Sequence, residues 1–418
     1  MEGMSDHEDC TDPGGVPFAE LDPALLRRER TSLKWTRYPA GVLPLFVAEM
    51  DFAVAPAIQR TLIERIRASD TGYLDGPGPL APAFAGFARD RWGWEIPHDR
   101  IHLATDVATG IVESLRRFLP RGGRLLLPTP VYPSFFEMLD EVPFEVVEVP
   151  LAREPGAAAA DSEEPDGDPA AVPAPRLDLD AIERAFAGEP GIDAFLLCSP
   201  HNPHGLIHSA EELSRLAELA ARYGVFVISD EIHAPLTHAG EPFTPFAPLA
   251  AAAGALAVTV TSASKGWNIA GTKCSVIVAA DERANATLRG LPPEVACRTS
   301  ILGLHASIAA FAESRDWLER AVAQIESNER LFGELLRDRL PGVRRTRSRA
   351  GYLNWLDFRA AGLGEDPARR LRDAARVALN SGPAFGAGGS GHARINLACA
   401  PDTIREAVRR IATALPER

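Results

Sequence analysis

Three polar side chains with complementary chemistry lie in the middle of the chain, each just after a short apolar run. They are Asn202 in PHNPHG, Asp230 in SDEIH and Lys265 in SASKGW. Taken singly, each has an ordinary structural explanation: a turn for Asn202 before a proline, a helix N-cap for Asp230, and a solvated surface amine for Lys265. Their joint occurrence in this order, each at the end of a strand candidate, instead predicts one site that combines an amide, a carboxylate and an amine.

A pyridoxal 5'-phosphate cofactor requires all three groups. A lysine amine forms a Schiff base with its aldehyde and later moves protons at the substrate Cα, and a carboxylate keeps the pyridine nitrogen protonated so that the ring can accept electrons. A neutral donor such as Asn202 serves the ring phenolate oxygen. The phosphate needs backbone N–H groups at a helix start, and the segment 105–111, TDVATGI, supplies one before the helix expected over 111–119. We therefore expect this cofactor on Lys265.

Alternating strands and helices must position these groups. Short unbroken apolar runs are typical of strands that are covered on both faces of a sheet. Between two of them lies a helix that Ser209 caps, with Glu212 at the reciprocal capping position and Gly224 at its end. This alternation predicts an α/β fold with a mostly parallel sheet flanked by helices, in which ligands bind at the carboxyl ends of the strands. The strand candidates are Ile101–Thr105, Arg124–Leu127, Phe144–Val149, Ala194–Cys198, Val225–Ser229, Ala257–Thr261 and Ser275–Ala279.

The pattern changes after residue 305, which predicts two domains. We expect residues 61–305 to form a large cofactor-binding domain and residues 306–418 a smaller α/β domain, with residues 1–60 contributing to the small one. Residues 153–175, rich in Ala, Pro, Asp and Glu, are interpreted as a flexible surface insertion, and the first 15 residues look equally disordered. In the small domain we expect a long helix over 306–339, strands over 352–358 and 393–397, and helices near 367–379 and 402–414.

Composition argues against several classes of function. A net charge of −13 over 418 residues disfavours binding to nucleic acid or to an anionic membrane surface. Five widely spaced cysteines without a CxxC pair indicate neither a disulfide framework nor a zinc site, and they favour a reduced, cytoplasmic setting. No apolar run approaches the roughly 20 residues of a membrane helix, and the acidic, polar start is unlike a signal peptide.

The motifs PHNPHG, SDEIH and SASKGWNIAG resemble those of fold-type I pyridoxal-phosphate enzymes in the class I/II aminotransferase superfamily. More closely, the chain resembles the MalY/PatB-type carbon–sulfur β-lyases, the bacterial cystathionine β-lyase group. The resemblance extends from about residue 30 to the C-terminus outside 153–175. It includes the segments FVAEMDF, TGYLDGPG, PVYPSFF, GYLNWLDF and FGAGGSGHARINLACAP.

The resemblance implies a role for each residue that matches a family motif. Lys265 would form the Schiff base and act as general base and acid, Asp230 would pair with the pyridine nitrogen, and Asn202 would bond the phenolate oxygen. Arg394 would clamp the α-carboxylate of an amino-acid substrate in a bidentate pair. The other implied cofactor contacts are Tyr132 and His233 at the ring, Gly110, Ile111, Ser262, Ser264 and Lys273 at the phosphate, and Tyr73 at the phosphate of the neighbouring subunit. A homodimer with shared active sites is therefore implied.

A few positions depart from the family pattern. His233 stands where many aminotransferases carry a tyrosine, and a histidine is common there in the lyase group. Lys273 replaces an arginine, which changes a planar fork into a point charge. Glu49 replaces an aspartate in FVAEMDF, and Asp106 and Thr109 are unusual in the phosphate turn. His233 thus favours the lyases.

The resemblance implies α,β-elimination on an L-amino acid with a sulfur leaving group at Cβ. Cystathionine or a related cysteine S-conjugate would give a thiol, pyruvate and ammonia. An aminotransferase acting with a 2-oxo acid is the alternative, because the two reactions share their early steps and differ in where Lys265 delivers its proton. A non-catalytic, cofactor-binding regulator is a third interpretation, which the intact Lys265, Asp230 and Arg394 disfavour. Elimination on an unusual amino acid within a biosynthetic pathway also stays open.

Overall fold

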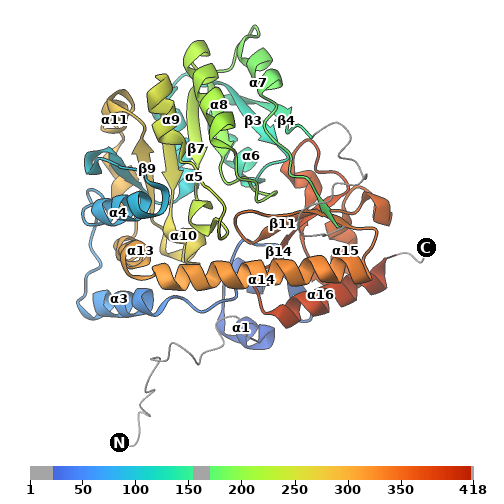
Figure 1. The fold of residues 1–418 in the computed structure, drawn as a ribbon. Coiled ribbons are helices and arrows are strands. Elements are labelled where there is room, and N and C mark those ends of the chain that lie inside the picture. Colours follow the sequence, from blue (N-terminus) through green and yellow to red (C-terminus); the bar gives the residue numbers. More distant parts are fainter. Residues whose placement is uncertain (1–21, 154–169, 416–418) are drawn as a thin grey trace, which may run out of the picture.

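The computed structural model describes residues 22–153 and 170–415, which form a large and a small unit, each built on a sheet (Figure 1). The large unit contains a seven-stranded sheet in the order β2-β9-β8-β7-β6-β3-β4. Neighbouring strands from β8 to β4 run parallel, whereas β9 runs antiparallel to both β8 and β2. The sheet is mostly parallel, as the sequence predicts. Its strands are β2 (Ile101–Ala104), β3 (Gly123–Thr129), β4 (Phe144–Pro150), β6 (Ala194–Cys198), β7 (Phe226–Asp230), β8 (Ala257–Thr261) and β9 (Ser275–Ala279).

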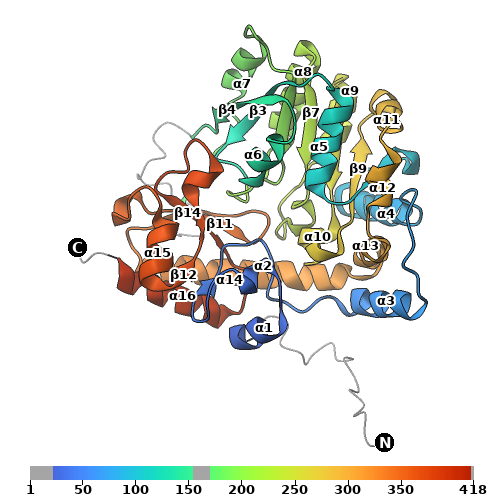
Figure 2. The same cartoon turned by 180° about the vertical axis from the view of Figure 1, so that it is seen from behind.

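Helices cover both faces of this sheet. Side chains alternate along each strand, so that Val227 of β7 packs in one core layer while Phe226 and Ile228 pack in the other. The layer in front of the sheet in Figure 1 comprises α4 (Leu80–Trp92), α7 (Leu179–Phe186), α8 (Ala210–Tyr223) and α9 (Phe246–Ala253), with α13 (Ile301–Glu313) at its lower edge. The layer seen in Figure 2 comprises α5 (Val107–Phe118), α6 (Ser134–Leu139), α11 (Glu282–Leu288) and α12 (Pro293–Cys297).

The small unit is built around a five-stranded sheet in the order β13-β14-β11-β10-β5. The long helix α14 (Arg315–Arg339) runs along both units (Figure 1). Its first turns pack Trp317 and Ile325 into the core of the large unit, and its later turns pack Phe332 and Leu336 into that of the small unit. The remaining elements of the small unit are β5 (Ala171–Val172), β10 (Arg344–Thr346), β11 (Leu353–Asp357), α15 (Pro367–Ala375), β12 (Val377–Ala378), β13 (Asn380–Ser381), β14 (His392–Asn396) and α16 (Pro401–Ala414).

The N-terminal segment contacts both units. Strand β1 (Leu43–Pro44) pairs in parallel with β12 of the small unit. Helix α3 (Pro56–Arg67), in contrast, packs against α13 of the large unit. Two short helices precede them, α1 (Pro23–Glu29) and α2 (Leu33–Thr36). The expected domain boundaries after residues 60 and 305 stay a prediction.

Local sequence signals locate the seven strands of the large sheet within two residues at each end, and the capping box of α8 is present as predicted. Two predicted helices are wrong in extent. The helix expected over 306–339 is two helices that meet at Ser314, and the one expected over 367–379 ends at Ala375 because Arg376 is left-handed (φ 55°) and β12 follows.

The predicted insertion at 153–175 is only partly described. Residues 154–169, like the first 15 residues, lie outside the described part of the chain. Residues 171–172 form β5, which pairs in parallel with β10 of the small unit. The end of the insertion is therefore anchored in a sheet, contrary to the expectation of a flexible loop throughout.

Candidate active site

Seven of the twelve predicted residues line a cavity of about 280 Å³ at the carboxyl ends of β6, β7 and β8, whereas Gly110, Ile111, Ser262, Tyr73 and Arg394 do not line it. This is the edge at which ligands bind in parallel α/β sheets. Asn202, Asp230 and Lys265 all line it, although they lie far apart in the sequence. The lining residues are Ala48, Asp106, Val107, Ala108, Tyr132, Ser134, Phe135, Met138, Cys198, Asn202, Asp230, Ile232, His233, Ser264, Lys265, Ala270 and Lys273.

Lys265 lies on the short helix α10 (Ala263–Gly266), which follows β8 directly. Its Nζ donates a hydrogen bond to the carbonyl oxygen of Ala48 at 2.9 Å. Burial, followed by the positive charge of Arg394, lowers the pKa of Lys265 to about 8, and the carboxylates of Glu49 and Asp230 oppose this shift. A substantial fraction of this amine is therefore neutral near physiological pH, as a nucleophile or base requires.

Asp230 is the last residue of β7. Burial raises the pKa of this carboxyl group to about 7, while the backbone N–H of Ile232 and the charge of Lys265 oppose the increase. Its Oδ1 accepts a hydrogen bond from the Ile232 N–H at 3.1 Å, and no partner of Oδ2 occurs among the described residues. A cationic ring nitrogen in the cavity would supply the missing partner and stabilise the charged form.

Arg394 comes from β14 of the small unit and reaches the same site. Its Nη1 donates to Oδ1 of Asn202 at 3.0 Å, and its Nη2 donates to the carbonyl oxygen of Phe46 at 2.9 Å. Burial lowers the pKa of Arg394 to about 10, which leaves it cationic at neutral pH. Because the oxygen of the Asn202 amide is occupied by Arg394, its NH₂ group is the part left to donate to a ligand.

The phosphate contacts predicted at Gly110 and Ile111 are wrong in position. Helix α5 begins at Val107, four residues earlier than expected, and the Gly110 N–H already donates to the carbonyl oxygen of Asp106 at 2.9 Å. Ile111 is buried in the core instead. The N–H groups of a helix's first turn lack helical partners, and Val107 and Ala108, the first two residues of α5, line the cavity. The first turn of α5, and not its second, therefore borders the cavity.

The side chains predicted to contact the phosphate already make hydrogen bonds within the protein. Lys273 lines the cavity and donates to Oδ2 of Asp106 at 2.7 Å, an ion pair absent from the sequence prediction. Ser264 lines it, with its hydroxyl oxygen 2.6 Å from that of Ser262, and its predicted phosphate contact stays a prediction. Ser262 does not line it, because its hydroxyl group donates to the carbonyl oxygen of Cys274 at 2.6 Å and caps α10. Ser262 therefore stabilises the start of the helix that carries Lys265 and does not itself line the cavity.

Three predicted aromatic residues have different positions. Tyr132 and His233 line the cavity. Burial, followed by the charges of Lys265 and Arg394, lowers the pKa of His233 to about 3, so its ring is neutral. Tyr73 is 92% exposed and does not line the cavity of its own chain.

Two residues near the site were missed by the sequence prediction. The first is Ala48, whose carbonyl oxygen accepts the hydrogen bond from the Lys265 amine. The second is Tyr352, which packs edge-on against His233 with ring centroids 6.4 Å apart. Arg394 and Glu49 both influence the pKa of Tyr352, which burial raises. Both residues lie in segments that resemble the lyase group, FVAEMDF and GYLNWLDF, and this resemblance was the signal that could have identified them.

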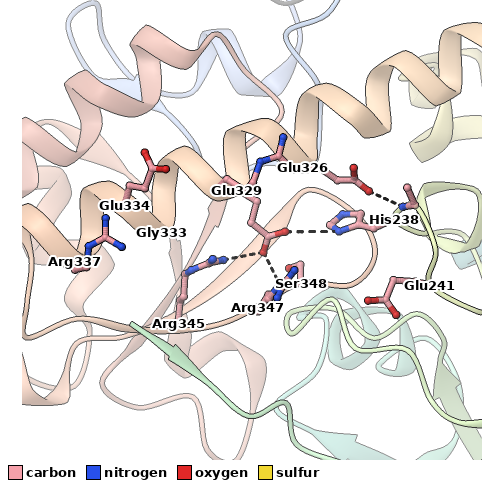
Figure 3. A pocket seen from close by; sticks show the side chains of 12 residues that line it. His238, Glu241, Glu326, Glu329, Gly333, Glu334, Arg337, Arg345, Arg347 and Ser348 are labelled. Atoms are coloured by element: carbon pink, nitrogen blue, oxygen red, sulfur yellow. Dashed lines mark hydrogen bonds and ion pairs between the residues drawn. The ribbon is translucent and has the colours of Figure 1, made fainter. Parts of the chain in front are cut away.

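A wider hollow of about 560 Å³ lies between α14 and β10 (Figure 3). At its centre, Oε1 of Glu329 accepts hydrogen bonds from Nη1 of Arg345 and from the Ser348 N–H, both at 2.8 Å. Oε2 of Glu329 lies 3.7 Å from Nδ1 of His238 in the large unit. None of the predicted site residues lines this hollow, and its buried Arg345–Glu329 ion pair joins β10 to α14.

Neither a metal centre nor a membrane segment is found in the described part of the chain. No three His, Cys, Asp or Glu side chains within residues 22–153 and 170–415 gather so as to hold a metal ion. Over the same residues, no helix combines the length and the apolar character needed to cross a membrane.

Comparison with known proteins identifies the relatives of this chain. The family model for aminotransferase class I and II matches residues 54–411. A Mycobacterium leprae (strain TN) protein, named as a candidate cystathionine beta-lyase, is 41% identical over 92% of this chain and 95% of its own. The cystathionine beta-lyase of Corynebacterium glutamicum is 34% identical over 95% of this chain and 100% of its own. The crystal structure of a candidate pyridoxal-phosphate-dependent beta-cystathionase from Corynebacterium diphtheriae superposes with a TM-score of 0.84 at 33% identity, over 94% of this chain and 98% of that one.

Proposed function

This chain belongs to the aminotransferase class I and II family, and from that premise we propose that it is a pyridoxal 5'-phosphate-dependent carbon–sulfur β-lyase. Its substrate would be L-cystathionine or a related cysteine S-conjugate, and its products a thiol, pyruvate and ammonia. The main support is that Lys265, Asp230 and Asn202 line one cavity. The chain is also 34% identical to a named cystathionine beta-lyase.

The residues of the cavity fit the cofactor. Lys265 offers an amine for its aldehyde, and Asp230 offers an unpartnered carboxylate oxygen for its ring nitrogen. Asn202 offers its NH₂ group to the ring oxygen, and the first turn of α5 offers the N–H groups of Val107 and Ala108 to the phosphate. When bound, the cofactor supplies an electron-accepting ring that is conjugated to the substrate Cα.

The chain's own residues then bind and orient the substrate and move its Cα proton. Arg394 is held by Asn202 and the Phe46 carbonyl with its guanidinium group ready for the substrate α-carboxylate. Lys265, with a pKa of about 8, accepts the Cα proton. Expulsion of the sulfur group from Cβ follows proton removal and completes the elimination.

The test is incubation of the purified protein with L-cystathionine and no 2-oxo acid. We expect many turnovers that release thiol and pyruvate in equal amounts. The Lys265→Ala and Lys265→Arg variants should lose activity, the second of these retaining the positive charge but not the reactive amine. Turnover that stops after one equivalent, or that requires an added 2-oxo acid, would instead assign the chain as an aminotransferase.

We further propose a homodimer in which Tyr73 reaches the phosphate of the partner's site. The support is that Tyr73 is 92% exposed, and that Ile63 and Ile66 of nearby α3 are also large, exposed apolar side chains. Light scattering should give twice the mass of the chain. Mixing Tyr73→Ala and Lys265→Ala chains should restore about a quarter of wild-type activity, because mixed dimers then contain one intact site. A monomer, or mixtures without any restored activity, would contradict this proposal.

A cytoplasmic location is the remaining proposal. Its support is that the cysteines of the described residues, Cys198, Cys274, Cys297 and Cys399, are all free thiols, as in a reducing compartment. Fractionation of cells followed by immunodetection tests it, and recovery in an extracellular or membrane fraction would contradict it.

A further inference from the structure

Strand β14 carries a second polar side chain that bears on the active site, two residues after Arg394. Asn396 is completely buried and does not line the active-site cavity. Its Nδ2 donates hydrogen bonds to the carbonyl oxygens of Val47 and Glu49, both at 2.7 Å. Its Oδ1 accepts a hydrogen bond from the Ala398 N–H at 2.7 Å. Both hydrogens of the amide are therefore used within the protein, so Asn396 does not donate to a ligand.

The two carbonyl groups that Asn396 holds lie on either side of one that reaches the site. Ala48 lies between Val47 and Glu49 and lines the active-site cavity. Its carbonyl oxygen accepts the hydrogen bond from Nζ of Lys265 at 2.9 Å. Because the carbonyl groups before and after it are both fixed to one amide, the Ala48 carbonyl group has little freedom to turn away from the lysine.

The carbonyl groups of residues 45–49 alternate between Asn396 and the active site. The Leu45 oxygen accepts a hydrogen bond from the backbone N–H of Asn396 at 2.9 Å. The Phe46 oxygen, in contrast, accepts one from Nη2 of Arg394, also at 2.9 Å. The side chain of Asn396 then holds the third and fifth carbonyl groups of the segment, and the fourth accepts from the active-site lysine.

Other hydrogen bonds of this segment do not replace those of the Asn396 amide. The Val47 oxygen also accepts from the Glu49 N–H, and the Glu49 oxygen also accepts from Nζ of Lys34, both at 2.9 Å. These two bonds stay within the N-terminal segment. Asn396 instead ties the segment to β14, the strand that carries Arg394.

We propose that Asn396 is a positioning residue of the active site that acts through segment 46–49. Its amide fixes the backbone whose carbonyl groups hold the amine of Lys265 and the guanidinium group of Arg394. One side chain thereby sets the place of the group that accepts the Cα proton and of the group that receives the substrate α-carboxylate. The inference thus rests on the proposed function and deepens it.

The first test measures the pH midpoint of cofactor uptake by the full-length chain after removal of the cofactor. A carbonyl acceptor stabilises an ammonium group more than a neutral amine, so loss of the Ala48 contact should lower the pKa of Lys265. Asn396→Leu, close to asparagine in size but without polar atoms, should move the midpoint downward by about half a unit. Asn396→Ser retains one donor and should shift it by less. An unchanged or a higher midpoint would overturn the proposal.

Asn328 of α14 supplies a matched control. It is also buried, and its Nδ2 donates to the carbonyl oxygens of Leu397 and Cys399 at 2.7 and 2.8 Å. Asn328→Leu therefore removes two hydrogen bonds of the same kind, neither of them to residues 45–49. It should lower the unfolding temperature as Asn396→Leu does, while the midpoint of uptake keeps its wild-type value.

Equal midpoint shifts in the two leucine variants would reduce Asn396 to a structural role. If Asn396→Leu does not fold, the same comparison is made between Asn396→Ser and Asn328→Ser, and a shift confined to the first is again the expected result.

The second test isolates the group that receives the α-carboxylate. L-Alanine and ethylamine differ only in that carboxylate, and each is titrated into the cofactor-bound enzyme by the change in absorbance. The ratio of their dissociation constants cancels the effects that they share, including any change at Lys265. Asn396→Leu should reduce the preference for L-alanine by about tenfold, since the carbonyl partner of Arg394 is displaced, whereas Asn328→Leu should preserve it. A preference that survives in Asn396→Leu would contradict the positioning of Arg394.

Neither readout requires turnover. Should the lyase assay fail while the Asn396 and Asn328 variants differ as described, the proposed reaction is wrong and the positioning role stands. Should the lyase assay succeed while the two sets of variants behave alike, the proposed reaction stands and this inference is wrong.

Discussion

When the cofactor is added to cofactor-free protein, Lys265 should form the Schiff base at neutral pH much faster than a lysine of ordinary pKa would. Only a neutral amine attacks an aldehyde. Burial, followed by Arg394, lowers the pKa of Lys265 from the ordinary 10.5 to about 8. The rate of uptake should therefore rise with pH to a midpoint near 8 and level off above it.

The magnitude follows from the fraction of neutral amine. At pH 7, a lysine with the ordinary pKa is about 0.03% neutral, whereas a pKa of 8 gives roughly 10%, an increase of about 300-fold or roughly 3 kcal/mol. Replacing Arg394 by glutamine removes a nearby positive charge, which should move the midpoint upward. Replacing Glu49 by glutamine removes the opposing negative charge and should move it downward.

Stopped-flow absorbance of the Schiff base, recorded from pH 6 to pH 10, measures this rate. Lys265→Arg provides the blank, since its guanidinium group does not form the Schiff base. A midpoint near 10.5, or a downward shift in Arg394→Gln together with an upward shift in Glu49→Gln, would show that Lys265 is not buried beside Arg394 in the way described.

Three further predictions concern other groups of the site. Asp230→Asn should bind the cofactor but lower lyase turnover by about 100-fold or more, because the ring nitrogen loses its charged partner; undiminished turnover would remove Asp230 from this role. Val107→Pro removes one N–H while suiting the first position of α5, and should weaken cofactor binding about tenfold by equilibrium titration; unchanged affinity would show that this N–H does not bind the phosphate. The buried Glu231 has a pKa of about 7 in the folded protein against an ordinary 4.5. The folded state thus binds this proton more tightly, and stability should fall as pH rises from about 4.5 to 7; in Glu231→Gln, thermal unfolding should lose that part of the pH dependence.

Much of the fold was predictable because its signals are local. The buried strands of a parallel sheet are short unbroken apolar runs, and the helix after β6 begins at a capping box that a few neighbouring residues define. Asn202, Asp230 and Lys265 could be grouped from the sequence because the carboxyl ends of parallel strands meet at one edge of a sheet. The misplaced features were those that local patterns do not encode, such as the break at Ser314 and the pairing of β12 with β1.

By itself, the sequence determined the chemistry of the site: an amine, a carboxylate and an amide at three strand ends. Only the tertiary structure decided their state and their neighbours. Arg394 meets Asn202 across 192 residues of chain, and Lys265 meets the Ala48 carbonyl across 217. The first turn of α5 presents Val107 and Ala108 rather than Gly110, because Asp106 begins the helix earlier than the apolar pattern indicates. Burial sets the pKa of the lysine and of the carboxyl group, and burial depends on the packing of every surrounding element, which no short stretch of sequence specifies.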